Sequence, residues 1–469
     1  MQNVLYFLLA TGAGILIIVI AALVLWRPGL NLWADAIIKR LMKDPYPENL
    51  GEMYNVFSKV GIQNTFESDL RATNGEPLQR PFGTSKHYSP WDKLLFSSVY
   101  LSRKPTIESV EIDTKVVLGP LAKRPLYIDI PVLIAGMAYG IGPSLQAKVA
   151  LAKAADLAGT ATSTGAGPFL PEERKHTKRL IMQYNRGFWA KEEEALRQAD
   201  AMEIQLGYGA HGSAPLLWKY EDLSPEFRDY MHLKPGQNLL EEAMLPNAGD
   251  GKELKALVDY LRQVTNGVPI GIKFGATHFL EAELEIFTGA GIDFLHMAGG
   301  EAGINHGPGI LADDVGLPTL PALCRAVAFL KQRGYQDKIS LIISGGLVTP
   351  GQMLKCLALG ADAVAVGTIA MLALTHTQIT KVIPWEPPTE LVFENGKSKH
   401  KLNVDEGARS VANFLKSCDA EIKNAIRNLG WSSLKQVSAA DLFALSPEVA
   451  NLTKTELGYL PSKKKVAVQ

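Results

Sequence analysis

Short apolar runs alternate with helix-length stretches through most of the chain, and this alternation constrains the fold more than any other feature. Eight such runs follow Leu126. A helical stretch separates each run from the next, so successive runs are expected to form parallel strands joined by right-handed crossovers. The predicted strands are 132–135, 160–163, 180–183, 202–205, 270–273, 294–296, 341–343 and 363–366. Eight parallel strands favour an α/β fold of the (β/α)8 TIM barrel type.

A doubly wound open sheet is the alternative α/β fold. It would carry a GxGxxG pattern after its first strand, where a dinucleotide phosphate approaches the backbone. The glycine-rich stretch GMAYGIG at 136–142 does not fit that pattern. The barrel is therefore the preferred fold.

The last two predicted strands end in small residues, and this pairing predicts a phosphate site. Ser344, Gly345 and Gly346 end the first of these runs, and Gly367 with Thr368 end the second. In a TIM barrel the loops after strands seven and eight, with a helix N-terminus, commonly bind phosphate. Two ordinary strand-to-helix turns are the alternative interpretation, because glycine is frequent at such turns.

Charge and cysteine content exclude several classes of function. Lys plus Arg and Asp plus Glu both total 48, so no single-signed field indicates a nucleic-acid partner. Cys324, Cys356 and Cys418 are far apart and in no CxxC spacing. This excludes a conventional cysteine-ligated iron–sulfur or zinc site within the chain and predicts no metal site. We interpret the cysteines as small buried apolar residues.

An uncharged apolar run from Val4 to Trp26 predicts a transmembrane anchor. Its length is close to the roughly 20 residues that a helix needs to cross a bilayer. A cleaved signal peptide is the alternative, but no positive charge precedes the run. Basic residues follow it, at Arg27, Lys39 and Arg40. By the positive-inside rule we expect a single-pass membrane protein with its catalytic domain on the cytoplasmic side.

Four parts are expected along the chain. They are the anchor 1–27, a lead-in segment 28–125 that wraps the barrel, the barrel 126–376, and a small C-terminal helical extension 377–469. The lead-in shows no sustained period and ends in the turn sequence GPLAKRP. The extension is predicted to hold a helix over 405–416 and a compact helical pair over 429–445.

Two predicted connections between a strand and its helix are much longer than usual. They span 207–250 and 299–318. Long loops at the mouth of a barrel are candidates for lids, and loops without a catalytic part are the alternative. Their polar and aromatic candidates are His211, Trp218, His306, Asp313 and Asp314.

Several motifs, taken in order along the chain, resemble the FMN-binding domain of glutamate synthases, in particular the free-standing synthase-like proteins that consist of little more than that domain. The motifs are WDKLLFSSVYLSR, IPVLIAGMAYG, ATSTGAG, IMQYN, GIKFGATH, AGGEAGINHGPG and the final SGG and VGT. They extend from about residue 91 to residue 445. The resemblance implies a barrel that carries FMN, whereas the glycine spacing alone suggests only a phosphate group.

The resemblance also implies cofactor contacts. Ala135, Gly136 and Met137 would line the flavin ring from the first strand, and Ser163 with Thr164 would offer polar contacts from the second. Gln183, on the third strand, would point at the ring or the substrate. A structural hydrogen-bonding role is the alternative for this residue.

Lys273 is the leading catalytic candidate. The resemblance implies a lysine near the pyrimidine edge of the flavin, where a cation stabilises the anionic reduced form. A snorkelling lysine at a strand end is the alternative. However, Lys273 lies between Ile272 and Phe274, where a cation is unfavourable unless an anion pairs with it. Glu301 matches an acidic residue of the family's glycine-rich loop and is the second candidate, for binding substrate or orienting the flavin.

Two histidines near predicted strand ends are interpreted as structural. His278 lies at a predicted helix start and His296 at a strand end. A general acid or base is the alternative for each.

The chain departs from the family pattern in three places. Full synthases carry a cysteine-rich segment for a 3Fe-4S cluster after the last strand, and the corresponding LALTHTQITKVIPW has no cysteine. The usual QGAKPG-type loop is replaced by LGYGAHGSAP, with Tyr208 and His211 in place of its polar groups. The apolar run also occupies the place where an N-terminal glutaminase cysteine would begin. We therefore expect no cluster, altered substrate recognition and no use of glutamine as ammonia source.

These features lead to one expected function. It is a membrane-anchored FMN oxidoreductase acting on the CH–NH2 group of donors, which interconverts an amino acid such as glutamate and its 2-imino or 2-oxo acid by hydride transfer at flavin N5. Its partners would be a small-molecule substrate, the lipid bilayer through residues 4–26 and a separate electron donor or acceptor. The direction of the reaction is left open.

Three alternatives remain. The first is a flavin dehydrogenase of a 2-hydroxy or amino acid that feeds a membrane electron acceptor. The second is a non-redox phosphate-binding barrel similar to inosine monophosphate dehydrogenases, which would need a nucleophilic cysteine that the loop 299–318 does not contain. The third is a membrane scaffold, against which Lys273 and the two phosphate loops argue.

Overall fold

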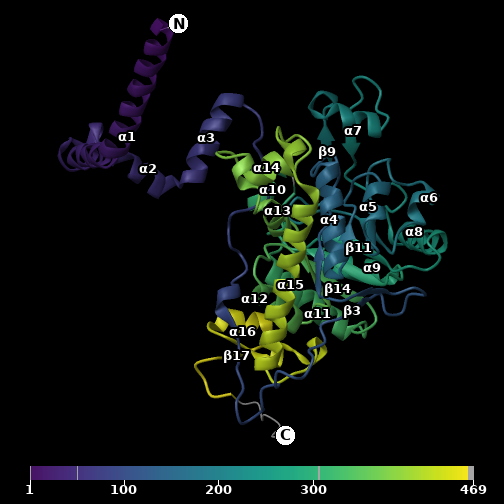
Figure 1. Cartoon of the computed structure of the whole chain (residues 1–469). Helices are drawn as coiled ribbons and strands as arrows, with labels where there is room; N and C mark the ends of the chain where they lie inside the picture. Colours follow the sequence, from purple (N-terminus) through teal and green to yellow (C-terminus); the bar gives the residue numbers. More distant parts are fainter. Residues whose placement is uncertain (1, 50, 305–306, 463–469) are drawn as a thin grey trace. The chain divides into compact units, whose positions relative to one another are not determined.

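The chain divides into two compact units, Met1–Leu78 and Gln79–Gln469. The computed structural model describes residues 2–49, 51–304 and 307–462, and Figure 1 shows their helices and strands. The boundary between the units falls inside the segment 28–125 that the sequence predicts as a single lead-in.

The first unit begins with the helix α1 (Gln2–Lys43), which contains the predicted apolar run and continues past it. The helix contains Pro28, whose ring removes one backbone hydrogen bond. The helix is long and apolar enough to cross a membrane, and none of its most apolar stretch is buried in the protein. A signal sequence near an N-terminus would satisfy the same criteria.

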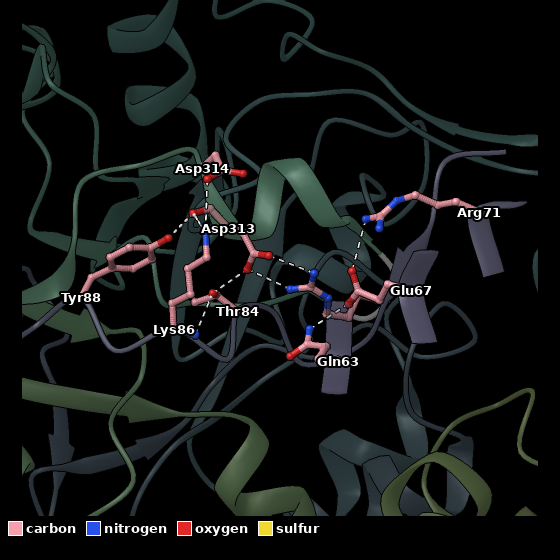
Figure 2. Close-up of polar contacts among 9 residues, drawn as sticks. Gln63, Glu67, Arg71, Thr84, Lys86, Tyr88, Asp313 and Asp314 are labelled. Carbon is pink, nitrogen blue, oxygen red and sulfur yellow. Dashed lines mark hydrogen bonds and ion pairs between the residues drawn. The ribbon is translucent and has the colours of Figure 1, made fainter. Parts of the chain in front are cut away.

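Two further helices correct the expectation that the lead-in is irregular. The helix α2 (Glu52–Val60) and the helix α3 (Ile62–Asn74) are separated by Gly61, which has φ 85°. Within α3, the carboxylate of Glu67 pairs with Arg71 one turn later at 3.2 Å, as Figure 2 also shows. The sequence pattern does not predict these helices because both are short and each contains many polar residues.

The second unit is built on a near-closed barrel of eight parallel strands, which confirms the predicted fold class. All eight predicted runs form strands. Their order around the sheet is β5-β15-β14-β12-β11-β8-β7-β6. At the seam between the first and last strands, the Ile134 amide donates to the Ala161 carbonyl at 3.0 Å. The strands are β5 (Val132–Ile134), β6 (Thr162–Ser163), β7 (Leu180–Tyr184), β8 (Ala201–Gln205), β11 (Ile270–Gly275), β12 (Phe294–Ala298), β14 (Ser340–Ser344) and β15 (Ala363–Val366).

Helices cover the outside of the barrel because each has an apolar stripe. In α8 (Gly251–Val264) the buried residues Leu254, Leu257, Val258 and Leu261 recur at helical spacing. The strands are buried on both faces, as expected for a parallel sheet covered by helices. The other covering helices are α4 (Leu145–Ala158), α9 (Leu280–Gly289), α11 (Thr319–Gln332), α12 (Pro350–Ala358) and α13 (Thr368–Thr375), and short helices α5 (Pro171–Lys175) and α6 (Glu193–Leu196) follow β6 and β7.

A hairpin closes the end of the barrel where the strands begin. Its strands β3 (Val116–Leu118) and β4 (Leu126–Ile128) pair antiparallel across the predicted GPLAKRP turn. The hairpin's buried residues share one apolar cluster with strand residues such as Leu133. The Gly119 amide donates to the Ser340 hydroxyl at the start of β14, at 3.1 Å. Ligand access is therefore confined to the opposite end.

The C-terminal part joins the barrel instead of forming a separate layer. The helix α15 (Val404–Asn428) extends well beyond the predicted 405–416 and packs along α4 and α13 (Figure 1). The segment 429–445, predicted as a helical pair, contains only short 3-10 turns and the strand β16 (Leu442–Ala444). This strand pairs with β2 (Leu94–Phe96) and with β17 (Glu456–Leu457). Burial of Leu442 and Ala444 on one face outweighs the helix propensity of this segment.

Candidate functional site

A cavity of about 780 Å³ lies at the carboxyl ends of the strands. This is the end of a TIM barrel where ligands bind. Ten of the predicted site residues line it: Ala135, Gly136, Met137, Lys273, Glu301, Ser344, Gly345, Gly346, Gly367 and Thr368. The other three, Ser163, Thr164 and Gln183, are buried behind this lining.

At the two glycines after β14, the space that a side chain would need is already occupied. Gly345 has φ 120° and Gly346 has φ 66°, so both adopt conformations that L-residues rarely accept. A Cβ added to Gly345 would lie 2.6 Å from the Thr319 hydroxyl oxygen, and one added to Gly346 would lie 2.8 Å from the Cβ of Glu301. Only glycine therefore fits at these two positions, and both line the cavity.

Two helix N-termini near the cavity differ in how they are capped. In α12 the Thr349 side chain and Gln352 form a reciprocal capping box. In α13 the N-cap residue is Gly367, which offers no side-chain cap. The first backbone N–H groups of α13 are therefore available to an anion, and Gly367 and Thr368 both line the cavity.

The residues behind the lining set its shape. A Cβ on Gly136 would lie 2.8 Å from both the Gln183 amide nitrogen and the Ser163 hydroxyl. The Thr164 hydroxyl accepts a hydrogen bond from the backbone N–H of Gln183 at 3.1 Å. The buried Lys148 ammonium donates to the Ser163 carbonyl at 2.8 Å. These contacts hold the ends of the second and third strands close to the backbone of the first.

Below the cavity lies a network of buried ionisable side chains that no local sequence pattern indicates. Glu203, on β8, accepts from the Gln183 side-chain amide at 2.8 Å and lies 2.5 Å from Nδ1 of His296. The other ring nitrogen of His296 lies 3.2 Å from the Ser344 hydroxyl. The network thus links β7, β8, β12 and β14 and ends at a residue that lines the cavity. It supports the structural interpretation of His296, but as part of a charged network.

The charges in this network are balanced. Burial alone would raise the pKa of Glu203, but His296 and the Lys273 ammonium outweigh burial and lower that pKa to about 2. Burial lowers the pKa of Lys273, and the Glu203 charge opposes this change. Burial also lowers the pKa of His296, again with Glu203 in opposition. Glu203 contacts Gln183 and His296 directly, and its negative charge acts on the buried Lys273 without a direct contact.

Glu301 is already bound by protein groups. One carboxylate oxygen accepts from the Ser89 hydroxyl at 2.5 Å, and the other accepts from the backbone and hydroxyl of Thr319, both at 2.7 Å. Thr319 begins α11, so the carboxylate lies at the positive end of a helix. Glu301 fixes the wall of the cavity at this position.

The segment 79–90, which we call the strap, forms the outer wall of the cavity. Its strand β1 (Gln79–Arg80) pairs with β13 (Gly307–Pro308) in the predicted lid 299–318. Arg80 binds both carboxylate oxygens of Asp313, at 2.8 and 2.9 Å. Figure 2 shows Thr84, Lys86 and Tyr88 gathered around Asp313 and Asp314. The strap is thereby held to the lid by a charged clasp.

Contacts in the clasp are short and charge-assisted. The Thr84 hydroxyl donates to Asp313 at 2.6 Å, and the Tyr88 hydroxyl donates to the Asp313 carbonyl. The Arg80 guanidinium holds the pKa of Asp313 below its usual range. Lys86 pairs with Asp314 at 3.3 Å in a much more exposed position. His306 of the same loop lies outside the described residues.

The second predicted lid, 207–250, places a hairpin beside the cavity. It consists of β9 (Leu216–Trp218) and β10 (Leu239–Glu241). Tyr208, Leu216 and Trp218 line the cavity, whereas His211 is buried outside its lining. Burial lowers the pKa of His211.

Neither cysteine chemistry nor a metal cluster is indicated in the part of the chain that the structure describes. Cys356 and Cys418 are buried, and burial raises the pKa of Cys324 to about 12. No group of three or more His, Cys, Asp or Glu residues among those described is arranged to hold a metal ion.

Comparisons of the sequence with protein families and with known proteins agree on one family. Residues 77–432 match the conserved region in glutamate synthase. A glutamate synthase large subunit-like protein from Rhizobium meliloti is 31% identical over 401 residues, which cover 81% of this chain and 89% of the relative. An archaeal-type NADPH glutamate synthase from Thermotoga neapolitana is 27% identical over 341 residues, which cover 72% of this chain and 67% of the relative.

Solved structures with a similar chain path are flavin enzymes at low identity. A mandelate oxidase has a TM-score of 0.45 at 16% identity, with 74% of this chain and 86% of that chain covered. A double mutant of flavocytochrome b2 with sulfite bound has a TM-score of 0.49 at 15% identity, with 80% of each chain covered. The family match supports the predicted cofactor, FMN.

Proposed function

The chain belongs to the glutamate synthase family, and from that premise we propose that it is a membrane-anchored FMN-dependent oxidoreductase that interconverts an amino acid and its 2-imino or 2-oxo acid. The observation that carries this proposal is that one cavity is lined by an uncapped helix N-terminus, by Gly345 and Gly346 with positive φ, and by the buried Lys273.

The cavity fits FMN in three respects. The backbone of Gly345, Gly346, Gly367 and Thr368 would hold the phosphate, since side chains are excluded there and the N–H groups of α13 are open. The second is the first strand, which would face the ring through Ala135, Gly136 and Met137. The third is the basic side chain of Lys273, which lines the same cavity.

Bound FMN supplies a two-electron acceptor: the amino acid loses two electrons and two hydrogens as its C–N single bond becomes C=N, and water then releases ammonia and the 2-oxo acid. Lys273 supplies positive charge beside the cavity, and Glu203 keeps that charge stable in a buried position. Glu301, held by Ser89 and Thr319, positions the wall that would face the cofactor or the substrate.

The membrane part of the proposal concerns α1. We infer that it spans a bilayer with the barrel on the cytoplasmic side, because the basic residues Arg27, Lys39, Arg40 and Lys43 follow the apolar run. An anchored barrel also favours a second reaction, in which an amino acid or a 2-hydroxy acid is oxidised and the electrons pass to a membrane acceptor.

Anaerobic reduction of the detergent-purified protein tests the reaction. The flavin absorbance should bleach on addition of an amino acid, and a nicotinamide or reduced quinone should bleach it if the synthase direction operates. Bleaching by 2-hydroxy acids and by no amino acid would replace the proposed substrate class with the second one. A flavin that no amino, 2-hydroxy or nicotinamide compound reduces would contradict the proposed activity.

A further inference from the structure

The wall of the cavity that faces away from the phosphate end is formed by different elements of the barrel. Around the ring of eight strands, β8 lies opposite β15. The residues that follow β8, together with the hairpin β9–β10, line the cavity at this place through Tyr208, Leu216 and Trp218. A substrate that reacts at the flavin ring, with the phosphate held at β14 and β15, would extend toward this wall.

The hairpin presents an apolar face to the cavity. Leu216 and Trp218 line the cavity, and Leu217 between them points outward and is 59% exposed. This alternation is the period of two expected of a strand. The wall that β9 contributes is thus built from one aromatic ring and one branched aliphatic side chain.

The charged side chains nearest this wall are paired with one another. The Tyr208 hydroxyl donates to Glu241 at 2.7 Å. The other oxygen of Glu241 accepts from Arg186 at 3.3 Å, and both side chains are fully buried. Arg186 also donates to the backbone carbonyls of Ser213, at 2.7 Å, and of Ala243, at 3.1 Å. The guanidinium is therefore not part of the cavity lining, and its charge is matched by Glu241.

Few cations remain for a substrate. Among the described residues that line the cavity, the basic side chains are Lys273, Lys86 and His87. Lys273 is buried, and the negative charge of Glu203 acts on it. Lys86 and His87 are neighbours on the strap, so they form a single basic region at the outer wall, partly balanced by Asp314. This arrangement provides for one substrate carboxylate, and a second would face the apolar wall.

We propose that the substrate side chain is aromatic or branched aliphatic, so that the reaction takes a monocarboxylic amino or 2-oxo acid in preference to glutamate and 2-oxoglutarate. This inference rests on the proposed function and names its substrate class. A second carboxylate against Tyr208, Leu216 and Trp218 would lose its hydration without a partner, which is strongly unfavourable. An apolar side chain gains by burial against the same residues.

Substrate titration of the holoenzyme separates the two proposals. Anaerobic rates of flavin bleaching would be compared for leucine, phenylalanine and glutamate, and perturbation of the flavin spectrum for 4-methyl-2-oxopentanoate, phenylpyruvate and 2-oxoglutarate. We expect the apolar acids to exceed their dicarboxylic counterparts by roughly 10-fold or more, the usual size of a pocket preference. Preference for glutamate and 2-oxoglutarate would overturn the inference and leave the proposed function intact. No response to any of these acids would overturn both.

Variants in β9 test the wall itself. Trp218→Ala should weaken binding of the preferred apolar acid by roughly 10-fold with a smaller change for pyruvate, because pyruvate does not reach the wall. Trp218→Phe should restore much of the binding. Leu217→Ala is the matched control, because Leu217 lies in the same strand and points away from the cavity. If Trp218→Ala does not fold, Leu216→Ala tests the same face. Equal effects on pyruvate and on the apolar acid, or an equal effect of Leu217→Ala, would contradict the role of this wall.

Discussion

The two ends of the cavity recognise charge in different ways. At β14 and β15 the lining consists of glycine backbone and an uncapped helix N-terminus, with no charged side chain needed. At β8, β11 and β12 the charges are side chains, and Glu203, His296 and Lys273 are all buried. The first end is specified by shape and by backbone dipoles, the second by a buried network of ionisable side chains.

This difference has a consequence for robustness. A backbone site fails when a side chain enters it, because the glycines have no space and adopt positive φ. A balanced buried network fails when any one of its members loses its charge, because the remaining members are left uncompensated. Substitutions at the two ends should therefore produce different defects, which the following experiments separate.

The largest effect is expected for Glu203→Gln. Removing this anion breaks its buried contact with Nδ1 of His296 and takes away the negative charge that acts on Lys273. Breaking a buried charged contact in this way destabilises proteins by roughly 3–5 kcal/mol. The midpoint of urea unfolding of the detergent-solubilised protein measures the change. Glu194→Gln, at an exposed glutamate, is the matched control. Equal midpoints for both variants would show that Glu203 does not balance the network.

Acidification tests the same end without mutation. The pKa of Glu203 in the folded protein is lowered to about 2 from the ordinary 4.5. The stability that this shift contributes is fully present above about pH 4.5 and is lost as the pH falls through about 2. Unfolding midpoints measured across this window should fall by more in the wild type than in Glu203→Gln. A parallel decline in the two proteins would contradict the assigned shift.

At the backbone end, Gly346→Ala should weaken FMN binding. The new Cβ would lie 2.8 Å from the Cβ of Glu301, and such overpacking costs roughly 1–3 kcal/mol. Equilibrium titration of the apoprotein with FMN, followed by flavin fluorescence, measures the loss.

Gly334→Ala separates strain from crowding. Gly334 also has positive φ, at 70°, but nothing lies within 4 Å of the added Cβ. This control should lose about 1 kcal/mol of stability from backbone strain and keep its FMN affinity. FMN affinity reduced equally in both variants would mean that the approach to Glu301 is irrelevant.

Lys273→Met should lower the midpoint potential of the flavin. The lysine charge favours the anionic reduced form, so its removal makes reduction harder, by on the order of 30–60 mV if the charge contributes about 1.4–2.8 kcal/mol. Spectroscopic titration against a reference dye measures the potential. Lys86→Met is the control, because Lys86 also lines the cavity but lies in a half-exposed ion pair. An unchanged potential in Lys273→Met would remove this residue from the mechanism.

The smallest effect is expected for the clasp of the strap. Asp313→Asn removes the bidentate ion pair with Arg80. Charge-assisted pairs of this kind contribute about 1 kcal/mol or more. We therefore expect the strap to open more often and the rate of FMN release to rise a few-fold. The rate of FMN release is measured in the presence of excess flavin-binding apoprotein, which traps the released FMN. Asp314→Asn, which removes only the exposed pair with Lys86, should leave the rate unchanged. Equal rates for both variants would exclude a closing role for the clasp.

The sequence predicted the backbone end of the cavity better than the charged end. Gly345, Gly346 and Gly367 carry a direct signal, because a phosphate loop needs small residues where two adjacent strands end. Lys273 was predicted from a resemblance and from the unfavourable burial of a cation between Ile272 and Phe274. The same argument applies to Glu203 between Met202 and Ile204, but the strand prediction treated that run only as an apolar strand.

Other features depend on contacts that no local pattern reveals. Arg186, Tyr208 and Glu241 meet only because the hairpin β9–β10 folds back beside β7 and β8. The strap meets Asp313 more than 200 residues later in the chain, at a separation of 233 residues for Arg80. The strand β16 replaces a predicted helix because it completes a small sheet with β2. Tertiary pairing determined each of these outcomes.

The most direct test of the account is the flavin content of the purified full-length protein. After denaturation, the released cofactor is identified by mass spectrometry and quantified by its visible absorbance. The account predicts FMN close to one molecule per chain, either as purified or after reconstitution. A colourless protein that neither retains FMN nor takes it up would contradict the assignment of this cavity.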